Sequence, residues 1–490
     1  MTTTIPPVVE QRSYIEGSWV ELKDTGRPLC DPNTGETRQQ KLTTPAEDVE
    51  RAIAAAYAFD QHGIADWIPL SERAKLLEAV ADEIDRRQEE IALQDSMNTG
   101  TPIMTARMIA SSLGSRIRSA VSDALALGNT IELGTPDRPV RLLRSPIGPA
   151  SIIGPWNAPT FTTVGKVAAA LLAGCPVLLK PSENAPSGTQ LFSEILGEEI
   201  SRNDLPGGYF QLVHGPASVG QLLTDDARIA ALSFTGGVDS GRTVAMAGAA
   251  SLAVMQMELG SNNPVIVRED ADVATTAAAI VQGVTRLNGQ WCEAPGKVLV
   301  HEKLHDALID ALHVEFEALQ IGHALEPQTE LGPLAFQRHR DSLLREVARL
   351  QSLGGSFLGS DELPDLNGWF ISPGLISGLA AHEAVNELFG PLVTVHSCQD
   401  DRESLMHANA PGGGLDAFVF GTDIEAAVQL GQRMRAGEVR INGTHMSDLA
   451  EGSQQSFWGT SGIGGHSPQY GVRFFLGDRV VGVDSSQFRL

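Results

Sequence analysis

Apolar side chains recur along the chain with two different periods. Residues 14–26 alternate polar and apolar side chains, as edge strands do. From Pro45 to Gly128 the spacing is helical, in segments such as AEDVERAIAAAYAFD and SERAKLLEAVADEIDRRQEEIALQ. The first quarter of the chain is therefore predicted to be mostly helical after a short β element.

After about Arg138, short apolar strands alternate with helices. The segments ASIIGPWN, PVLLKPSE, FQLVHG and ALSFTGG are typical of buried strands, and KVAAALLAG and QLFSEILGEEI lie between them as helices. Such alternation predicts a parallel sheet covered on both faces. A second region of this kind follows Glu258. The strand-like tail VRFFLGDRVVGVDSS is expected to pair with another chain or domain. The pattern thus predicts an α/β protein with two domains and an extra β element.

Composition narrows the function. The chain has 490 residues, with 36 basic and 60 acidic side chains and a net charge of -24. A chain this acidic repels phosphate backbones and anionic membrane surfaces, so neither nucleic acid nor membrane is expected as a partner.

The cysteines and the apolar runs indicate a cytoplasmic protein. The four cysteines form no CxxC pair and have no histidine cluster nearby, which argues against disulfides and a metal site. No secretory signal is visible at the N-terminus. The longest apolar run, from Val167 to Leu179, is interrupted by Gly174 and Pro176 and is too short to span a bilayer.

Two residues are candidates for catalysis. Cys292 lies in LNGQWCEAPGKVLV; a lone cysteine is usually an inert core residue, but Gly289 and the polar flank indicate a turn that would expose a reactive thiolate. Glu258 ends the apolar segment SLAVMQMEL. It is either a satisfied structural carboxylate or a general base whose pKa is raised by apolar neighbours.

Two turns are candidates for binding a nucleotide. FTGGVDSG places Gly236 and Gly237 between a strand and a helix, where helix N–H groups bind phosphate, although the usual GxGxxG pattern is absent. LLKPSE places Lys180 and Glu183 just beyond a buried strand, at the sheet edge where ligands bind. The alternative for FTGGVDSG is a plain strand-to-helix turn, and the alternative for Lys180 and Glu183 is an exposed ion pair.

Taken together, ordered segments along most of the chain resemble the aldehyde dehydrogenase superfamily. The matching segments are GPWNAP, KPSE, LPGGYFQLVHG, FTGG, MELGSNNP, NGQWC, LGPL, ELFGP and SGIG. The resemblance implies a Rossmann-type cofactor domain (1–126 and 147–258), an α/β catalytic domain (259–445) and a small β oligomerisation element (127–146 and 470–490). It also implies a homodimer or homotetramer.

The resemblance also implies the reaction. Cys292 matches the nucleophile, Asn157 the amide that completes an oxyanion hole, and Glu258 the base that activates water. An aldehyde would be oxidised to a carboxylic acid through a thiohemiacetal and a thioester. Relatives that pass the thioester to coenzyme A typically lack the glutamate, so coenzyme A remains the alternative acceptor. A non-enzymatic scaffold is disfavoured because all three residues are present.

The cofactor implied by the resemblance is a nicotinamide dinucleotide. Glu183 favours NAD, because the 2′-phosphate of NADP would meet a carboxylate, but NADP remains possible. The matching positions are Pro155, Trp156, Lys180, Glu183, Gly236, Gly237, Leu259, Glu387 and Phe389.

The substrate positions implied by the resemblance are Phe161, Gly165, Trp291, Glu293 and Phe457. Gly165 stands where many relatives carry tryptophan, which suggests a roomier pocket for a bulky aromatic or hydrophobic aldehyde. A semialdehyde, or a cationic amino-aldehyde facing Glu293, is the alternative.

Three positions depart from the family pattern. Gly237 replaces a serine, Ser261 a glycine in ELGG, and Trp458 a glycine near SGIG.

Overall fold

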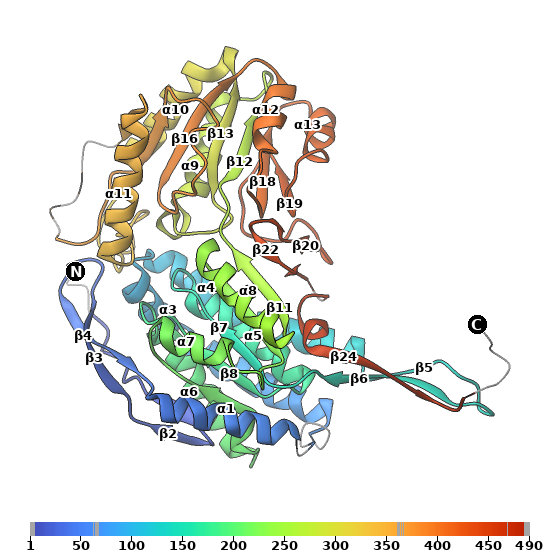
Figure 1. The fold of residues 1–490 in the computed structure, drawn as a ribbon. Coiled ribbons are helices and arrows are strands. Elements are labelled where there is room, and N and C mark those ends of the chain that lie inside the picture. The colour runs from blue at the N-terminus through green and yellow to red at the C-terminus, as the bar shows by residue number, and fades with distance from the viewer. Residues whose placement is uncertain are drawn as a thin grey trace.

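Two mainly parallel β-sheets, each covered by helices, lie one above the other, and a β arm extends from the lower one (Figure 1). The computed structural model describes residues 5–61, 63, 68–359, 363, 365, 367–467 and 469–484. Among these residues, no helix is sufficiently long and apolar to cross a membrane.

The first sheet has eight strands in the order β2-β1-β9-β8-β7-β10-β11-β22. The five strands from β9 to β11 are parallel, and antiparallel strands extend both edges. The bounds are β1 Ser13–Ile15, β2 Ser18–Val20, β7 Ala150–Ile153, β8 Val177–Lys180, β9 Phe210–Leu212, β10 Ala231–Gly236, β11 Val254–Leu259 and β22 Gly462–Ile463.

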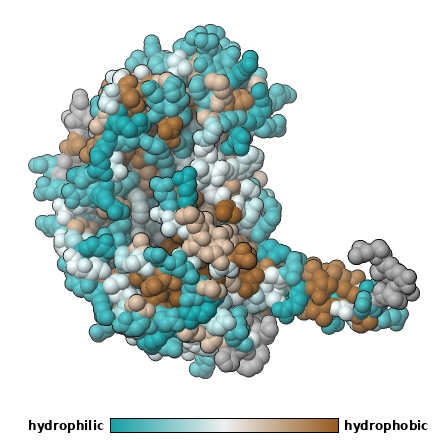
Figure 2. Space-filling view, viewed as in Figure 1, coloured by the Kyte–Doolittle hydropathy of each residue, from teal (hydrophilic) through white to brown (hydrophobic). Residues whose placement is uncertain are grey.

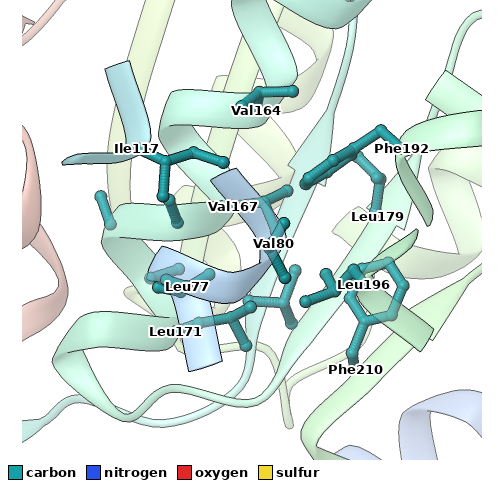
Figure 3. Close-up of a cluster of buried hydrophobic side chains, with 14 of the residues drawn as sticks. Leu77, Val80, Ile117, Val164, Val167, Leu171, Leu179, Phe192, Leu196 and Phe210 are labelled. Carbon is teal, nitrogen blue, oxygen red and sulfur yellow. The ribbon is translucent and has the colours of Figure 1, made fainter. Parts of the chain in front are cut away.

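Both faces of this sheet are buried, as its continuous apolar strands predict. Strand alternation sends Val177 and Leu179 into one apolar cluster and Leu178 into another. Figure 3 shows part of the first cluster, where Leu179 and Phe210 meet helix residues such as Val167. That face is covered by α3 Leu70–Thr99, α4 Ile103–Leu127, α5 Pro159–Ala173 and α6 Ser187–Arg202. The other is covered by α1 Ala46–Gln61, α7 Ala217–Thr224 and α8 Val238–Ser251.

The second sheet has seven strands in the order β14-β15-β16-β13-β12-β18-β19, all parallel except for the edge pair β14 and β15. Its strands are β12 Asn263–Val267, β13 Pro295–His301, β14 Ser356–Gly359, β15 Gly374–Ser377, β16 Leu392–Cys398, β18 Asp416–Phe420 and β19 Glu438–Ile441. Its helices are α9 Val273–Thr285, α10 His305–Glu317, α11 Gln337–Ser352, α12 Asp401–Ala408 and α13 Ile424–Gly431.

The arm is an antiparallel sheet in the order β24-β6-β5. Its strands are β5 Thr130–Glu132, β6 Val140–Pro146 and β24 Leu476–Gly482. The strand-like tail therefore pairs with β6 of its own chain. Figure 2 shows an apolar patch on the arm. Its exposed apolar side chains are Ile131, Leu133, Val480, Val481 and Val483.

Within the described residues, three short strand pairs and four 3-10 turns complete the fold. β3 Lys23–Cys30 and β4 Thr37–Thr43 form a hairpin near the N-terminus. β17 Gly413–Gly414 pairs with β21 Trp458–Gly459, and β20 Gln455–Ser456 pairs with β23 Gly465–His466. The 3-10 turns are η1 Gly207–Tyr209, η2 Arg286–Gly289, η3 Glu302–Leu304 and η4 Val472–Phe475.

Candidate active site

Cys292 lies in a tightly constrained loop between η2 and β13. Leu287, Asn288 and Gly289 have φ values of 50°, 59° and 74°, so three consecutive residues are left-handed. A Cβ on Gly289 would lie 2.0 Å from the carbonyl carbon of Gly390, which leaves room for glycine alone. The loop is therefore fixed by its backbone as well as by its side chains.

Side-chain amides tie this loop to its surroundings. Asn288 Nδ2 donates to the carbonyl of Gly100 at 2.7 Å, and Asn263 Nδ2 donates to the carbonyl of Cys292 at 2.7 Å. Gln290 Oε1 accepts from the N–H of Ala335 at 2.9 Å. These bonds hold the thiol in place before any ligand binds.

Glu258 reaches the thiol from the first sheet. It is buried near the end of β11, where it pairs with Gly462 of β22. Its Oε1 lies 4.0 Å from Cys292 Sγ, so the fold joins two residues that are 34 positions apart. The catalytic pair predicted from the sequence is thus a contact between the two sheets.

Cations surround Glu258, and the predicted increase in its pKa is wrong. Lys166 Nζ lies 2.9 Å from Oε2, and His466 Nε2 lies 3.3 Å from Oε1. Burial alone would raise the pKa of Glu258, but Lys166 and His466 outweigh it and hold the pKa well below its usual value. The apolar neighbours Met257 and Leu259 have little influence, because successive strand side chains point to opposite faces.

The thiol has the opposite environment. Burial, and then the nearby carboxylates of Glu258 and Glu293, raise the pKa of Cys292 well above its usual value. This shift favours the protonated thiol, the opposite of the thiolate that its turn suggested. Glu258 is the carboxylate positioned to accept its proton.

Asn157 lies beside the cysteine loop. It precedes α5, which begins with a proline at its first position and ends at Gly174, where φ is 95°. Asn157 Nδ2 donates to the carbonyl of Gln290 at 2.8 Å. An amide has two N–H groups, so the second is available for a substrate oxygen next to Cys292.

The adenosine-side candidates meet at the carboxyl edge of the first sheet. Lys180 ends β8 and Gly236 ends β10, as expected for a ligand edge. Burial lowers the pKa of Lys180 to about 8, and Glu183 acts against that decrease. Glu183 also pairs with Arg27 at 2.5 Å, a partner from the β3–β4 hairpin that the sequence did not reveal.

The start of α8 fits a pyrophosphate. Gly237 precedes the helix and is exposed, and a Cβ there would meet no atom within 4 Å. Its open N–H groups suit phosphate oxygens without the serine hydroxyl that relatives carry.

Trp156, which follows Pro155, packs in an aromatic cluster. Its ring centroid lies 5.4 Å from that of Phe389, 4.9 Å from that of Phe336 and 5.0 Å from that of His339. The sequence indicated Trp156 and Phe389 but not Phe336 or His339, which lie in another segment with no matching motif.

Glu387 packs against the ELGS segment, which runs from Glu258 to Ser261. Its Oε1 accepts from the N–H of Ser261 at 3.1 Å, and burial raises the pKa of Glu387 to about 8. A Cβ on Gly260 would lie 2.0 Å from Glu387 Oε2, so this glycine makes room for the carboxyl. The carboxyl of Glu387 thus packs against Gly260 and Ser261, the two residues that follow Leu259.

Aromatic side chains lie close to Cys292 and to His466. Phe161 and Trp291 belong to one apolar cluster with Cys292. Phe457 packs edge-on against His466, with ring centroids 5.0 Å apart. The remaining members of the cluster are Ile109, Ala158, Leu287, Ala294 and Met446.

Two guanidinium groups cover these aromatic faces. Arg116 lies 3.9 Å from the centroid of Phe161, and Arg286 lies 5.3 Å from the centroid of Trp291. A Cβ on Gly165 would lie 3.7 Å from Arg116 Nε. Arg116 thus occupies space beside the position where relatives carry tryptophan.

Glu293 is partly buried and is not a solvated surface group. Burial raises its pKa, His466 lowers it and Glu258 raises it further. The charges of Glu258 and His466 therefore influence the pKa of Glu293, and Glu293 in turn influences the pKa of Cys292.

The departures from the family pattern are accommodated differently. Ser261 is buried, and its hydroxyl has no hydrogen bond within the described part of the chain. Trp458 is 44% exposed on the β17–β21 hairpin. In the same described residues, no three His, Cys, Asp or Glu side chains are grouped as a metal site would require.

The comparisons with known proteins agree with this geometry. The model of the aldehyde dehydrogenase family matches residues 19–481. A non-phosphorylating aspartate-semialdehyde dehydrogenase from Halomonas elongata is 32% identical, over 95% of this chain and 94% of its own. A geranial dehydrogenase from Castellaniella defragrans is 31% identical, over 90% and 92%.

A solved structure shows the same fold. Betaine aldehyde dehydrogenase from Staphylococcus aureus, in complex with NAD+, superposes with a TM-score of 0.90 at 27% identity and covers 98% of each chain. The fold and the relatives therefore define an oxidoreductase built on two α/β sheets. The chain belongs to the aldehyde dehydrogenase family. The family and the fold class predicted from the sequence are both confirmed.

Proposed function

We propose that this protein oxidises an aldehyde to a carboxylic acid with Cys292 as nucleophile and Glu258 as base. The observation that carries the proposal is the 4.0 Å contact between Cys292 Sγ and Glu258 Oε1, with the Asn157 amide bound to the same loop. The cofactor is NAD, as in the structural relative.

The first step is attack by sulfur. Glu258 takes the proton of the thiol, and the sulfur bonds to the aldehyde carbon while the carbonyl electron pair moves onto oxygen. The N–H of Cys292 and the amide of Asn157 donate to that oxygen, each typically contributing ~3 kcal/mol.

The second step is release of the acid. NAD supplies the oxidation by accepting the hydride of the aldehyde carbon, which leaves a thioester on Cys292. Glu258 first passes the proton that it took from the thiol to solvent and is a carboxylate again. It then takes a proton from water while the hydroxide adds to the thioester carbon. The carbon–sulfur bond breaks, the sulfur regains a proton from Glu258, and the carboxylic acid is released. Lys180, Glu183 and the N-terminus of α8 would hold the adenosine and pyrophosphate, and Trp156, Glu387 and Phe389 the nicotinamide side.

The proposed substrate is a bulky aromatic or hydrophobic aldehyde. Phe161 and Trp291 share an apolar cluster with Cys292, and Phe457 packs on His466; large apolar side chains near a site favour large apolar ligands. Relatives include enzymes named geranial dehydrogenase and phenylacetaldehyde dehydrogenase.

A spectrophotometric aldehyde panel with NAD and with NADP tests reaction, substrate and cofactor together. NADH should form fastest with benzaldehyde-like or long-chain aldehydes, and the acid should form without coenzyme A. A preference for acetaldehyde would refute the substrate proposal, and no reduction with any aldehyde would refute the reaction.

We also propose a homo-oligomer in the cytoplasm. The apolar side chains exposed on the arm, including Val480 and Val481, are costly to leave in water and suit contact with a second copy. Light scattering on the purified protein and on Val480→Asp should show a multimer that loosens in the variant. A reducing compartment keeps the Cys292 thiol free, and cell fractionation tests the location.

A further inference from the structure

Arg116 has an unusual position beside the catalytic loop. It lies on α4, and its guanidinium stacks 3.9 Å from the ring centroid of Phe161, a neighbour of Cys292 in the same apolar cluster. No residue within the described ranges makes a hydrogen bond or ion pair with it, and its Nε is buried without a partner. The guanidinium thus lies on a ring of the cluster that contains Cys292, and within the described ranges no protein acceptor is in hydrogen-bond contact with it.

Such a guanidinium is costly unless something binds it. Arg116 is partly buried, and its fully covered Nε has lost its hydration without a hydrogen bond in exchange. Burial lowers the pKa of Arg116, and Glu258, Asp448 and Glu293 only partly offset this effect. The donors of Arg116 therefore remain available to an incoming acceptor.

The neighbouring residue Gly165 keeps this space open. A Cβ there would lie at ordinary contact distance, 3.7 Å from Arg116 Nε and 3.8 Å from a terminal nitrogen. A larger side chain at 165 would compete with the guanidinium for the same volume. The absence of a side chain at Gly165 therefore leaves room for the guanidinium of Arg116 and does not simply enlarge an apolar pocket.

A cationic substrate fits poorly. Recognition of a quaternary ammonium uses open aromatic faces. Here Arg116 covers Phe161, and Arg286 covers Trp291 at 5.3 Å. Arg286 also donates to the carbonyl of Thr444, so it is fixed in place while Arg116 is not.

We propose that Arg116 binds an anionic group at the far end of the substrate, so the substrate is an aldehyde with an apolar stem and a distal carboxylate. The planar fork of a guanidinium matches a carboxylate with two parallel hydrogen bonds. The aromatic residues pack the stem, and Arg116 sets the specificity. This inference rests on the proposed oxidation of aldehydes.

Matched substrate pairs separate charge from bulk. The first pair is 4-carboxybenzaldehyde and 4-methylbenzaldehyde, and the second is 5-oxopentanoate and pentanal. With the native protein, kcat/KM should be about 10- to 100-fold higher for the carboxylated member of each pair, as expected for a charge-assisted hydrogen bond. Equal values, or a preference for the neutral member, would overturn the inference while leaving the reaction itself intact.

Variants at position 116 assign the preference. Arg116→Met should remove the preference through a higher KM for the carboxylated aldehydes, so that the two members of each pair have similar kcat/KM values. A single cooperative melting transition reports that the variant is folded. Arg116→Lys should recover part of the preference. Arg107→Gln is the matched control, because Arg107 lies on the same helix in an exposed pair with Glu89. A preference that survives in Arg116→Met would show that another group binds the carboxylate.

A thermal-shift binding experiment tests the anion site independently of catalysis. Glutarate should raise the melting temperature of the native protein and of Arg107→Gln, whereas pentanoate should have little effect. The glutarate shift should be absent in Arg116→Met. If no aldehyde is oxidised but the shift behaves in this way, the anion site stands and the proposed reaction fails. If glutarate produces no shift in the native protein, the anion site fails.

Discussion

The two halves of the catalytic centre, Glu258 from the first sheet and Cys292 from the loop before the second, lie in opposite electrostatic surroundings. Lys166 and His466 lower the pKa of Glu258, whereas burial and carboxylates raise the pKa of Cys292. Burial acts to raise the pKa of both side chains, so burial does not explain the difference. The sign of the neighbouring charge decides which group keeps the proton.

The contrast has a consequence for the reaction. An ionised base 4.0 Å from a protonated thiol can activate sulfur at the moment of attack. A permanently ionised thiol would be exposed to oxidation between turnovers. In the proposed reaction, the proton of the Cys292 thiol therefore passes to the Glu258 carboxylate.

Removing the sulfur should have the largest effect. Cys292→Ala should lower the rate of acid formation by roughly 10⁴-fold or more, because no covalent intermediate forms. The measurement is NADH production with the best aldehyde of the panel. Cys398→Ala, at a buried cysteine in β16, is the control and should keep its activity. Substantial activity in Cys292→Ala would refute the nucleophile.

Removing the base should separate the two steps. In Glu258→Gln the thioester should form and then persist, so a burst of NADH precedes a steady rate that is lower by about 10²- to 10⁴-fold. Stopped-flow absorbance and mass spectrometry of the acylated protein measure both phases. A linear time course at full rate would contradict the role of Glu258 in releasing the acid.

Removing the cation should change the pH dependence. Lys166→Met should raise the pKa of Glu258, because the cation lowers it in the native protein. The carboxylate is active when ionised, so the acid limb of the kcat profile should shift to higher pH. His466→Asn should shift it in the same direction by a smaller amount, and Lys303→Met, in an exposed pair with Glu269, should not. An unchanged limb in Lys166→Met would mean that the ion pair does not control the base.

Asp95 tests what burial does to a carboxylate when no cation offsets it, and its replacement should have the smallest effect on activity. Burial raises the pKa of Asp95 to about 7, and the hydroxyl of Thr160 donates to its Oδ2. A raised folded-state pKa means that this group stabilises the protein at low pH and that its contribution is lost as pH rises from about 4 through about 7.

Asp95→Asn should therefore flatten this part of the stability profile. The loss avoided is on the order of 4 kcal/mol at neutral pH, and it appears as a melting temperature that falls less between pH 5 and pH 8. An identical profile for the variant and the native protein would show that Asp95 does not titrate in this range.

Much of the fold follows from pattern. Continuous apolar runs such as VLLK in β8 predict parallel strands buried on both faces, and the helical spacing before Gly128 predicts α1, α3 and α4. The pairing of β24 with β6 did not follow from the apolar pattern, because an alternating strand fits any open edge; only the family resemblance grouped the two segments.

The site was predictable only in part. Motifs mark Cys292, Glu258 and Asn157, but the roles of these residues in turnover stay predictions until variants are measured. The sequence gives no sign of Arg116, which lies on an ordinary-looking helix and meets Phe161 only through helix packing. His466 is equally hidden, since the β20–β23 hairpin brings it to Glu258. Apolar neighbours in the sequence also misled the expected pKa of Glu258, because charges from distant segments dominate it.

The shared volume of Gly165 and Arg116 has an evolutionary consequence. A large aromatic residue at 165 together with arginine at 116 would be overpacked, and small residues at both positions would leave a void. Single substitutions from either arrangement therefore pass through a destabilised protein. Lineages that exchange one arrangement for the other should change the two positions together, so covariation between them across relatives would record each switch between neutral and charged aldehydes.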